Sequence, residues 1–239
     1  MKGGAKVISP KIAKLIQYLP DTFVDFIARK VVDHIIKKYV DLDIKGQENI
    51  IGLKKPVIFI CNHLSNSDGL ILDRLLREQD VTYVAGIKLT QNATTNFGVR
   101  LLKTTVVKPN TADKEGLTKV INILKGGNNI LIFPEGTRSR TGSMIEAKKG
   151  ILLIAKLTKA TIVPLGIWGT EKFMPISKEG DMAAETFYHA KVGLRVGKPM
   201  ELPVKENGED RHAYDERAII TLMKAIAELI PEEYRGIYR

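Results

Sequence analysis

The sequence lacks the features that mark secreted and membrane-spanning proteins. A single cysteine in 239 residues excludes an intrachain disulfide and fits a reducing compartment. No uncharged apolar run approaches the roughly 18 residues that are needed to cross a bilayer. Lysines occur near the N-terminus, but no compact apolar core with a small-residue cleavage site follows them. We therefore expect no signal peptide.

Motifs of several common enzyme classes are also missing. The sequence has no Gly-x-Ser-x-Gly, which α/β serine hydrolases carry, and neither a Walker A motif nor Gly-x-Gly-x-x-Gly. These absences argue against a serine hydrolase, a nucleotide-dependent kinase and a dehydrogenase. The four histidines are scattered and no Cys-x-x-Cys is present, so we expect no metal site and no bound cofactor.

Positive charge is abundant. The formal net charge is +10, which favours a polyanionic partner such as nucleic acid, an anionic membrane surface or a phosphorylated substrate. A basic nucleic-acid-binding module would explain the charge but not the two polar turns described below. We therefore expect no nucleic-acid partner. The hydrophobic content of 44% is ordinary for a globular protein.

Residues 1–40 differ in pattern from the rest of the chain. Apolar residues recur at helical spacing before Pro20, and a second helix with a broad apolar face is predicted from Asp21 or Thr22 to about Tyr39. This segment carries half of the net charge. It is either a helical hairpin packed on the core or an amphipathic two-helix segment that docks on a membrane, and we predict the second.

Residues 41–239 have the pattern of an α/β domain. Apolar strand-like runs alternate with helical segments, which predicts a mixed, largely parallel sheet flanked by helices on both faces. Pro164 is expected at a sheet edge or a strand end, because proline cannot donate to the ladder. The expected strands cover 42–45, 57–60, 81–85, 104–107, 129–133, 161–167 and 191–196, and the expected helices cover 69–78, 117–124, 149–157 and 219–230.

The first polar turn contains His63 and Asp68. It follows the buried run 57–60 and precedes a helical pattern, and ligands bind at such strand-to-helix turns in open α/β sheets. A histidine transfers protons near neutral pH, and a carboxylate can orient it. Alternatively, Asp68 caps the next helix and His63 is simply solvated. Cys61 could be a thiol nucleophile, but its place at the end of an apolar strand favours core packing.

The second polar turn, Pro134 to Arg140, follows another buried strand. Arg138 offers a planar fork of donors suited to a phosphate, and Gly136 lets a ligand approach the backbone closely. Lysines at 148 and 149 add positive charge nearby. The alternative is a local ion pair between Glu135 and Arg138 in a solvated loop.

Together the turns resemble the glycerophospholipid acyltransferase family, in particular its 1-acyl-sn-glycerol-3-phosphate acyltransferases, over roughly Val57 to Thr170. The family's Asn-His-x-Ser-x-x-Asp block matches residues 62–68, and its Phe-Pro-Glu-Gly-Thr-Arg-Ser block matches residues 133–139. Its Val-Pro strand resembles residues 162–165. Lys108 stands where the family usually has an arginine, and a lysine can serve there as a point charge. Lys88 stands where the family tends to keep a lysine.

This resemblance implies transfer of an acyl group from a thioester, either acyl-CoA or acyl carrier protein, to the sn-2 hydroxyl of 1-acyl-sn-glycerol-3-phosphate. His63 would be the base and Asp68 would orient it, as in a Ser-His-Asp triad whose serine is replaced by the substrate hydroxyl. The implied glycerol-phosphate ligands are Glu135, Gly136, Thr137 and Arg138, with Lys108 and Lys88 as secondary candidates.

Two alternatives to this function remain open. One is an acyltransferase that acts on another lysophospholipid or on glycerol phosphate, and the other is a non-catalytic membrane- or lipid-binding protein. With a lipid acceptor and a basic amphipathic segment, we expect a peripheral, monotopic protein on the cytoplasmic face of the cell membrane. Its expected partners are an anionic membrane surface, a lysophospholipid acceptor and an acyl thioester donor.

Overall fold

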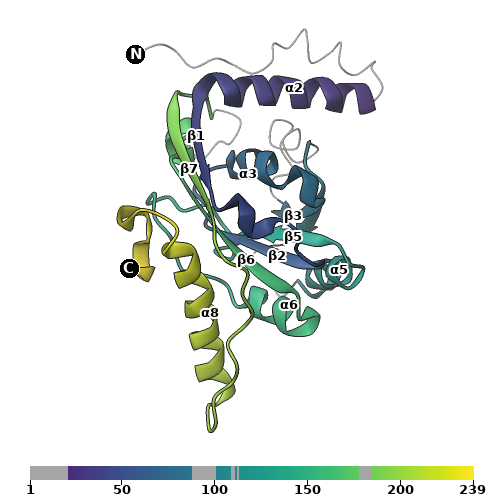
Figure 1. Cartoon of the computed structure of the whole chain (residues 1–239), viewed down its shortest axis with the longest axis vertical. Coiled ribbons are helices and arrows are strands. Elements are labelled where there is room, and N and C mark those ends of the chain that lie inside the picture. The colour runs from purple at the N-terminus through teal and green to yellow at the C-terminus, as the bar shows by residue number, and fades with distance from the viewer. Residues whose placement is uncertain (1–20, 88–100, 109–110, 112, 178–184) are drawn as a thin grey trace.

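The computed structural model describes residues 21–87, 101–108, 111, 113–177 and 185–239 (Figure 1). The first helix of the expected N-terminal hairpin and Lys88 lie outside these residues. The strands are β1 (Val40–Lys45), β2 (Val57–Cys61), β3 (Val81–Gly86), β4 (Thr104–Val107), β5 (Asn129–Ile132), β6 (Thr161–Trp168) and β7 (Ala190–Val196). The helices are α2 (Asp21–Tyr39), α3 (Asp68–Leu76), α5 (Lys114–Lys125), α6 (Gly150–Thr158), α7 (Thr170–Phe173) and α8 (Arg211–Ala227).

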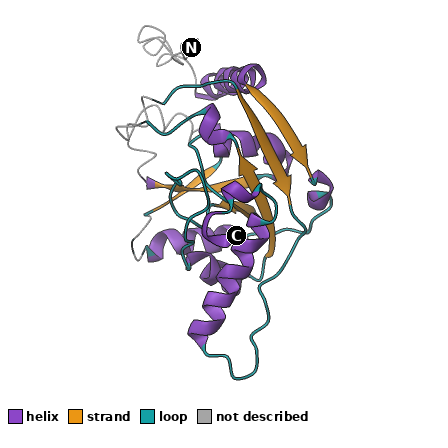
Figure 2. Cartoon of the chain, turned by 90° about the vertical axis from the view of Figure 1, so that its left-hand side faces the viewer, coloured by secondary structure: helices purple, strands orange, loops and turns teal. Residues whose placement is uncertain are grey.

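In the described part of the chain the strands form one seven-stranded sheet in the order β1-β7-β6-β2-β5-β3-β4. All neighbouring strands are parallel except β6 and β7, which are antiparallel. The sheet is strongly twisted, so that β1 and β7 run at a steep angle to the central strands (Figures 1 and 2). This confirms the predicted mixed, largely parallel sheet.

Two apolar clusters cover the two faces of the sheet. Alternate residues of β2 point to opposite faces, as the pleat requires: Ile58 and Ile60 belong to the cluster beneath α5, α6 and α8, while Phe59 and Cys61 belong to the cluster beneath α2 and α3. All the residues of β2 are buried. A strand that is covered on both faces has apolar residues at successive positions, so β2 could be predicted from its continuous apolar run.

Pro164 corrects one expectation, because it lies in the middle of β6, an interior strand, opposite Ile60 of β2. The pairing of β6 with β7 begins only at Leu165, and the next contact is the isolated bridge from Ile162 to Met200. The regular hydrogen bonding between β6 and β7 is therefore interrupted beside Pro164. Because no described strand pairs with β6 there on the β7 side, the N–H group that proline lacks costs the sheet little stability.

The last helix begins earlier than expected. Asp210 caps α8, its Oδ1 accepting a hydrogen bond from the Ala213 backbone N–H at 2.9 Å. The first turns of α8 are largely polar, so the apolar period that begins at Ile219 marks only its second half. No helix in the described residues is both long and apolar enough to cross a membrane.

Candidate active site

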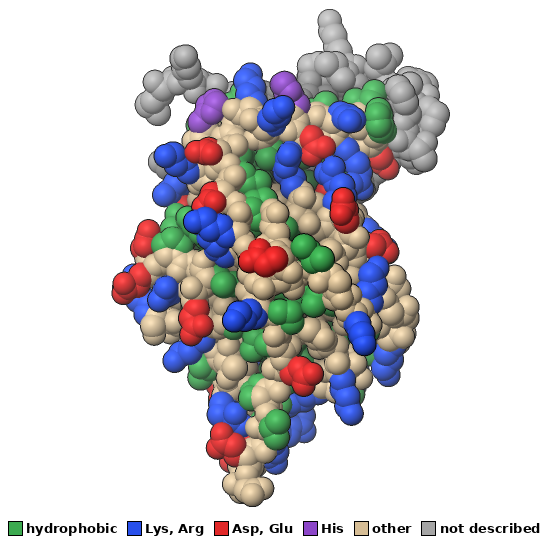
Figure 3. Space-filling model, in the orientation of Figure 1, with side chains coloured by type: hydrophobic (Ala, Val, Ile, Leu, Met, Phe, Trp, Pro, Cys, Tyr) green, Lys and Arg blue, Asp and Glu red, His purple; other side chains and the backbone are tan. Residues whose placement is uncertain are grey.

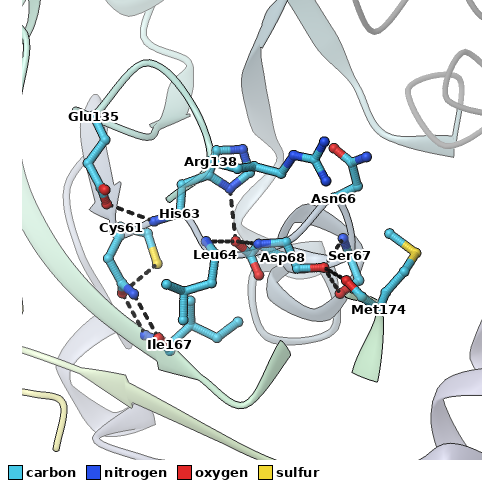
Figure 4. A network of polar contacts seen from close by, with 12 residues as sticks. Cys61, His63, Leu64, Asn66, Ser67, Asp68, Glu135, Arg138, Ile167 and Met174 are labelled. Atoms are coloured by element: carbon cyan, nitrogen blue, oxygen red, sulfur yellow. Dashed lines mark hydrogen bonds and ion pairs between the residues drawn. The ribbon is translucent and has the colours of Figure 1, made fainter. Parts of the chain in front are cut away.

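The two polar turns meet because β2 and β5 are parallel neighbours. Ile60 pairs with Ile132, so the residues that follow each strand leave the same edge of the sheet (Figure 4). The backbone also joins the turns, since the Ser139 N–H donates to the His63 carbonyl oxygen at 2.8 Å. Residues 72 positions apart in sequence thus form one site.

His63 and Asp68 are in direct contact. The Nδ1 atom of His63 lies 2.8 Å from Oδ2 of Asp68. Asp68 is fully buried, whereas 16% of the His63 side chain is exposed. A buried carboxylate accepts, so Nδ1 carries the proton and Nε2 keeps a free lone pair. The imidazole is therefore in the tautomer that a general base requires.

The contacts of Asp68 exclude the helix-capping alternative. Its Oδ2 atom also accepts hydrogen bonds from the backbone N–H groups of Leu64 at 2.7 Å and Ser65 at 2.9 Å, which precede it in the chain. Its Oδ1 atom is buried and has no hydrogen-bond partner among the described residues. The carboxylate thus holds the turn and the imidazole together, and it does not cap α3.

The ring of His63 is held on a second side by Phe133. The two rings are stacked, with centroids 4.0 Å apart and planes inclined by 14°. Phe133 lies between β5 and the second turn, so the chain that enters this turn contributes directly to the orientation of the imidazole. No motif in the sequence indicates this contact.

Glu135 lies inside the protein. Its Oε1 accepts from the His63 backbone N–H at 2.9 Å, and its Oε2 accepts from the Ile145 N–H at 3.0 Å. The residue is fully buried, and burial raises the pKa of its carboxyl group to about 8, while the two N–H bonds oppose the rise. In this arrangement Glu135 joins the two turns rather than facing the surface where a phosphate would bind. It does not pair with Arg138.

The next three residues lie nearer the surface. Gly136 and Thr137 are exposed, and Gly136 has a φ of 70°, which a residue with a Cβ adopts only with strain. The Arg138 side chain is 15% exposed and donates from Nη1 to Oε1 of Glu185 at 2.7 Å. Glu185 lies between the expected strands 161–167 and 191–196, and no motif or periodic pattern in the sequence indicates a role for it.

Lys108 lies farther from the centre of the site. It follows β4, which is separated from β5 by β3, and its backbone N–H donates to Asp113 Oδ2. The residue is exposed at the same edge of the sheet as the two turns. No contact in the described residues ties its side chain to His63 or Arg138.

Comparison with known proteins agrees with this geometry. The model of the family described as Acyltransferase matches residues 41–168, which is more than half of the chain. This chain belongs to the acyltransferase family.

Individual relatives carry a more specific name. The chain is 30% identical over 181 residues to the chloroplastic 1-acyl-sn-glycerol-3-phosphate acyltransferase of Arabidopsis thaliana. This alignment covers 74% of this chain and 49% of the relative. The chain is 30% identical over 172 residues to a probable enzyme of the same name from Mycoplasma pneumoniae, covering 67% of this chain and 62% of the relative. The chain spans about half the length of the plant relatives.

A solved structure shares the fold. The crystal structure of the 1-acyl-sn-glycerophosphate acyltransferase PlsC from Thermotoga maritima matches with a TM-score of 0.62 and 24% identity. The match covers 92% of this chain and 87% of the other. The two proteins therefore share the arrangement of the sheet and its helices.

Other polar residues brace the candidate site. Asn62 joins β2 to β6, its Nδ2 donating to the Ile167 carbonyl at 2.8 Å and its Oδ1 accepting from the Ile167 N–H at 2.9 Å. The Ser65 hydroxyl donates to the Met174 carbonyl at 2.8 Å. Cys61 is fully buried, and burial raises the pKa of its thiol, so the expectation of core packing is confirmed.

The C-terminal residues brace the second turn. Met144 N–H donates to the Tyr234 carbonyl at 2.8 Å, and Ala147 N–H donates to the Tyr238 hydroxyl at 3.1 Å. These contacts hold the loop whose Ile145 N–H binds Glu135. They come from beyond the matched family region, and motif reading could not have found them. Within the described residues, no group of three or more His, Cys, Asp and Glu side chains is placed to hold a metal ion.

Glu135 gives the stability of the protein a defined pH dependence. Its pKa of about 8 in the folded protein lies above the ordinary 4.5, so the folded state binds this proton more tightly than the unfolded chain. The stabilisation of the folded state by this proton is fully present below about pH 4.5 and is lost as pH rises through about 8. Replacing Glu135 with glutamine puts an N–H₂ donor opposite a backbone N–H, which costs about 1–3 kcal/mol.

We expect the deficit of the Glu135→Gln variant, measured by urea unfolding, to be largest at pH 5 and to narrow by pH 8.5. Glu201→Gln, a change at an exposed position, is the control and should show a constant small difference. A deficit that stays constant from pH 5 to pH 8.5 would mean that Glu135 is already ionised at pH 5, and would contradict the raised pKa.

Proposed function

We propose that the protein transfers an acyl group from a thioester to the sn-2 hydroxyl of 1-acyl-sn-glycerol-3-phosphate, giving phosphatidic acid. The observation that carries the proposal is the 2.8 Å contact from His63 to buried Asp68, with Arg138 on the adjoining turn. The family match and the names of the relatives support the same acceptor.

The proposed reaction is a direct displacement. As the acceptor hydroxyl attacks the thioester carbonyl carbon, Nε2 of His63 takes the hydroxyl proton, and Asp68 stabilises the imidazolium. The tetrahedral intermediate then collapses, the carbon–sulfur bond breaks, and the thiolate leaves with the proton returned by His63. A thiol has a pKa of about 8.5, so the thiolate departs with little help and no acyl-enzyme is needed.

We assign the acceptor phosphate to the exposed part of the second turn. Arg138 supplies charge and paired donors, and Gly136 and Thr137 supply a surface that the glycerol phosphate can approach. Lys108 and Lys88 remain secondary candidates. Glu135 contributes indirectly, by holding the His63 backbone. Either acyl-CoA or acyl carrier protein can supply the thioester.

Replacing His63 tests this function. Removal of a general base typically lowers kcat by roughly 100- to 10,000-fold, so we expect His63→Ala to lose phosphatidic acid synthesis to that extent while remaining folded. The assay is mass spectrometry of products from a panel of lysophospholipids with acyl-CoA or acyl carrier protein. Wild-type turnover of other acceptors only, or no turnover of any thioester, would contradict the proposal.

We further propose that α2 docks the enzyme peripherally on an anionic membrane. One face of α2 packs inward through Ala28 and Ile36, which are buried. The opposite face leaves Phe26 58%, Ile27 43% and Val31 41% exposed. This exposure disagrees with the alternative in which these three side chains pack on the α/β core. An amphipathic helix with such a face suits the bilayer interface.

Basic residues lie on the same side of α2 as the apolar ones. Lys30, Lys37 and Lys38 are exposed there, and Figure 3 shows basic, histidine and hydrophobic side chains together at this end of the molecule. Each basic residue near an anionic surface contributes about 1 kcal/mol. The cytoplasmic leaflet is rich in anionic lipid, so we assign the protein to the cytoplasmic face.

The packing of α2 would bring the membrane close to the site. On α2, Oδ1 of Asp33 lies 3.5 Å from Nη1 of Arg74 and 3.3 Å from Nη2 of Arg77. Arg74 belongs to α3, which begins at Asp68. A lipid acceptor could therefore reach His63 without crossing a long stretch of water.

Changing Phe26, Ile27 and Val31 together to serine tests the docking surface. We expect binding to anionic vesicles in co-sedimentation to fall about 10-fold or more, because the loss of interfacial burial costs more than 1.4 kcal/mol. The control changes Ile51, Val204 and Ile237, which are 77%, 86% and 67% exposed, to serine. Equal loss in both triple variants, or none in the first, would contradict docking by α2.

A further inference from the structure

We propose that Glu185 is a positioning residue that aims Arg138 at the phosphate of the acceptor. This inference rests on the proposed function. Glu185 follows β6 and α7 and precedes β7, beyond the matched family region, so it belongs to neither of the two motif-bearing turns. Its carboxylate nevertheless contacts one residue from each turn.

The two contacts are short and partly buried. Oε1 of Glu185 accepts from Arg138 Nη1 at 2.7 Å, and Oε2 accepts from Asn66 Nδ2 at 2.9 Å. Only 1% of the Glu185 side chain is exposed. Figure 4 shows the side chains of Arg138 and Asn66 pointing toward the same side of the site. Because Asn66 lies between His63 and Asp68 in sequence, Glu185 ties Arg138 to the turn that carries the base.

Glu185 is itself firmly placed. The neighbouring Phe187 ring stacks on Phe173 with centroids 5.0 Å apart, and the Tyr188 N–H donates to the Phe173 carbonyl at 2.8 Å. The adjacent Met174 carbonyl accepts from the Ser65 hydroxyl. The segment that carries Glu185 is thus anchored both to α7 and to the His63 turn.

A tether of this kind changes what an arginine can do. A free arginine in a turn loses rotamer entropy when it binds a phosphate, whereas one already held in place loses less. Among the described residues, Glu185 engages one nitrogen of Arg138, which leaves Nε and Nη2 for two oxygens of a phosphate. Glu185 therefore sets the direction in which the free edge of the guanidinium points.

The alternative role of Glu185 has the opposite effect on acceptor binding. A carboxylate beside the arginine would repel a phosphate and compete for the same donors, in which case removing Glu185 would tighten acceptor binding. The two effects have opposite signs, so the Michaelis constant for the acceptor separates them. The partial burial of the pair favours positioning, since a largely buried guanidinium without its partner is costly.

The experiment compares Glu185→Ala, Glu185→Gln and Arg138→Ala in steady-state assays with 1-acyl-sn-glycerol-3-phosphate and acyl-CoA. Loss of binding that acts equally on ground and transition state raises KM and spares kcat. We expect Glu185→Ala to raise the acceptor KM about 10-fold or more, with kcat and the donor KM within about threefold. Arg138→Ala should raise the acceptor KM further.

The conservative variant supplies a second readout. Glutamine keeps an oxygen that can accept from Arg138, so Glu185→Gln should retain most of the affinity, with a rise of about threefold in acceptor KM. This variant carries the test if the alanine variant does not fold. Glu209→Ala is the matched control, because Glu209 accepts two hydrogen bonds of 2.8 Å from the Arg217 guanidinium. Glu209 precedes α8 and Arg217 lies within it, so both residues are outside the site.

The outcomes test the positioning role of Glu185 separately from the proposed acyltransferase function. An acceptor KM that is unchanged or lower in the Glu185 variants, with active wild type and impaired Arg138→Ala, overturns the positioning role alone. A wild-type protein that does not acylate this acceptor overturns the proposed function. A KM rise of the same size in Glu209→Ala would mean a general loss of structure, and would also overturn the positioning role.

Discussion

The site depends on one oxygen atom, Oδ2 of Asp68. It accepts from the His63 ring and from two successive backbone N–H groups, and the residue is fully buried. The donors pay part of the desolvation cost of a buried carboxylate, and the carboxylate in return fixes both the path of the turn and the tautomer of the imidazole. The shape of the turn and the chemistry of its base therefore have the same cause.

Two further buried carboxylates extend this arrangement, and each links elements that are distant in sequence. Glu135 joins the His63 backbone to the loop that the C-terminal residues brace, and Glu185 joins Asn66 to Arg138. Glu185 does so with a charge-assisted hydrogen bond to Arg138, and Glu135 does so with two hydrogen bonds from backbone N–H groups. A base and a phosphate-binding arginine can thus be carried on turns and still keep a fixed separation, which catalysis by positioning requires.

The sequence predicted what depends on local pattern. The buried strands before His63 and Pro134 were evident from their apolar runs, and their parallel pairing brings the two turns together. What it missed depends on partners far along the chain. The interior place of Pro164 follows from where β7 leaves the ladder, and the burial of Glu135 follows from two distant N–H groups. Glu185 lies in no periodic segment, so only its three-dimensional contacts reveal it.

The most direct test of this account is the kcat of the Asp68→Asn variant. Asparagine keeps the shape and an acceptor oxygen for the backbone N–H groups, but it lacks the charge that stabilises the imidazolium. The account predicts a folded protein, with the urea midpoint near that of wild type, whose kcat falls at least about 100-fold at unchanged acceptor KM. A folded variant with kcat within about tenfold of wild type would contradict the central role of the Asp68 carboxylate.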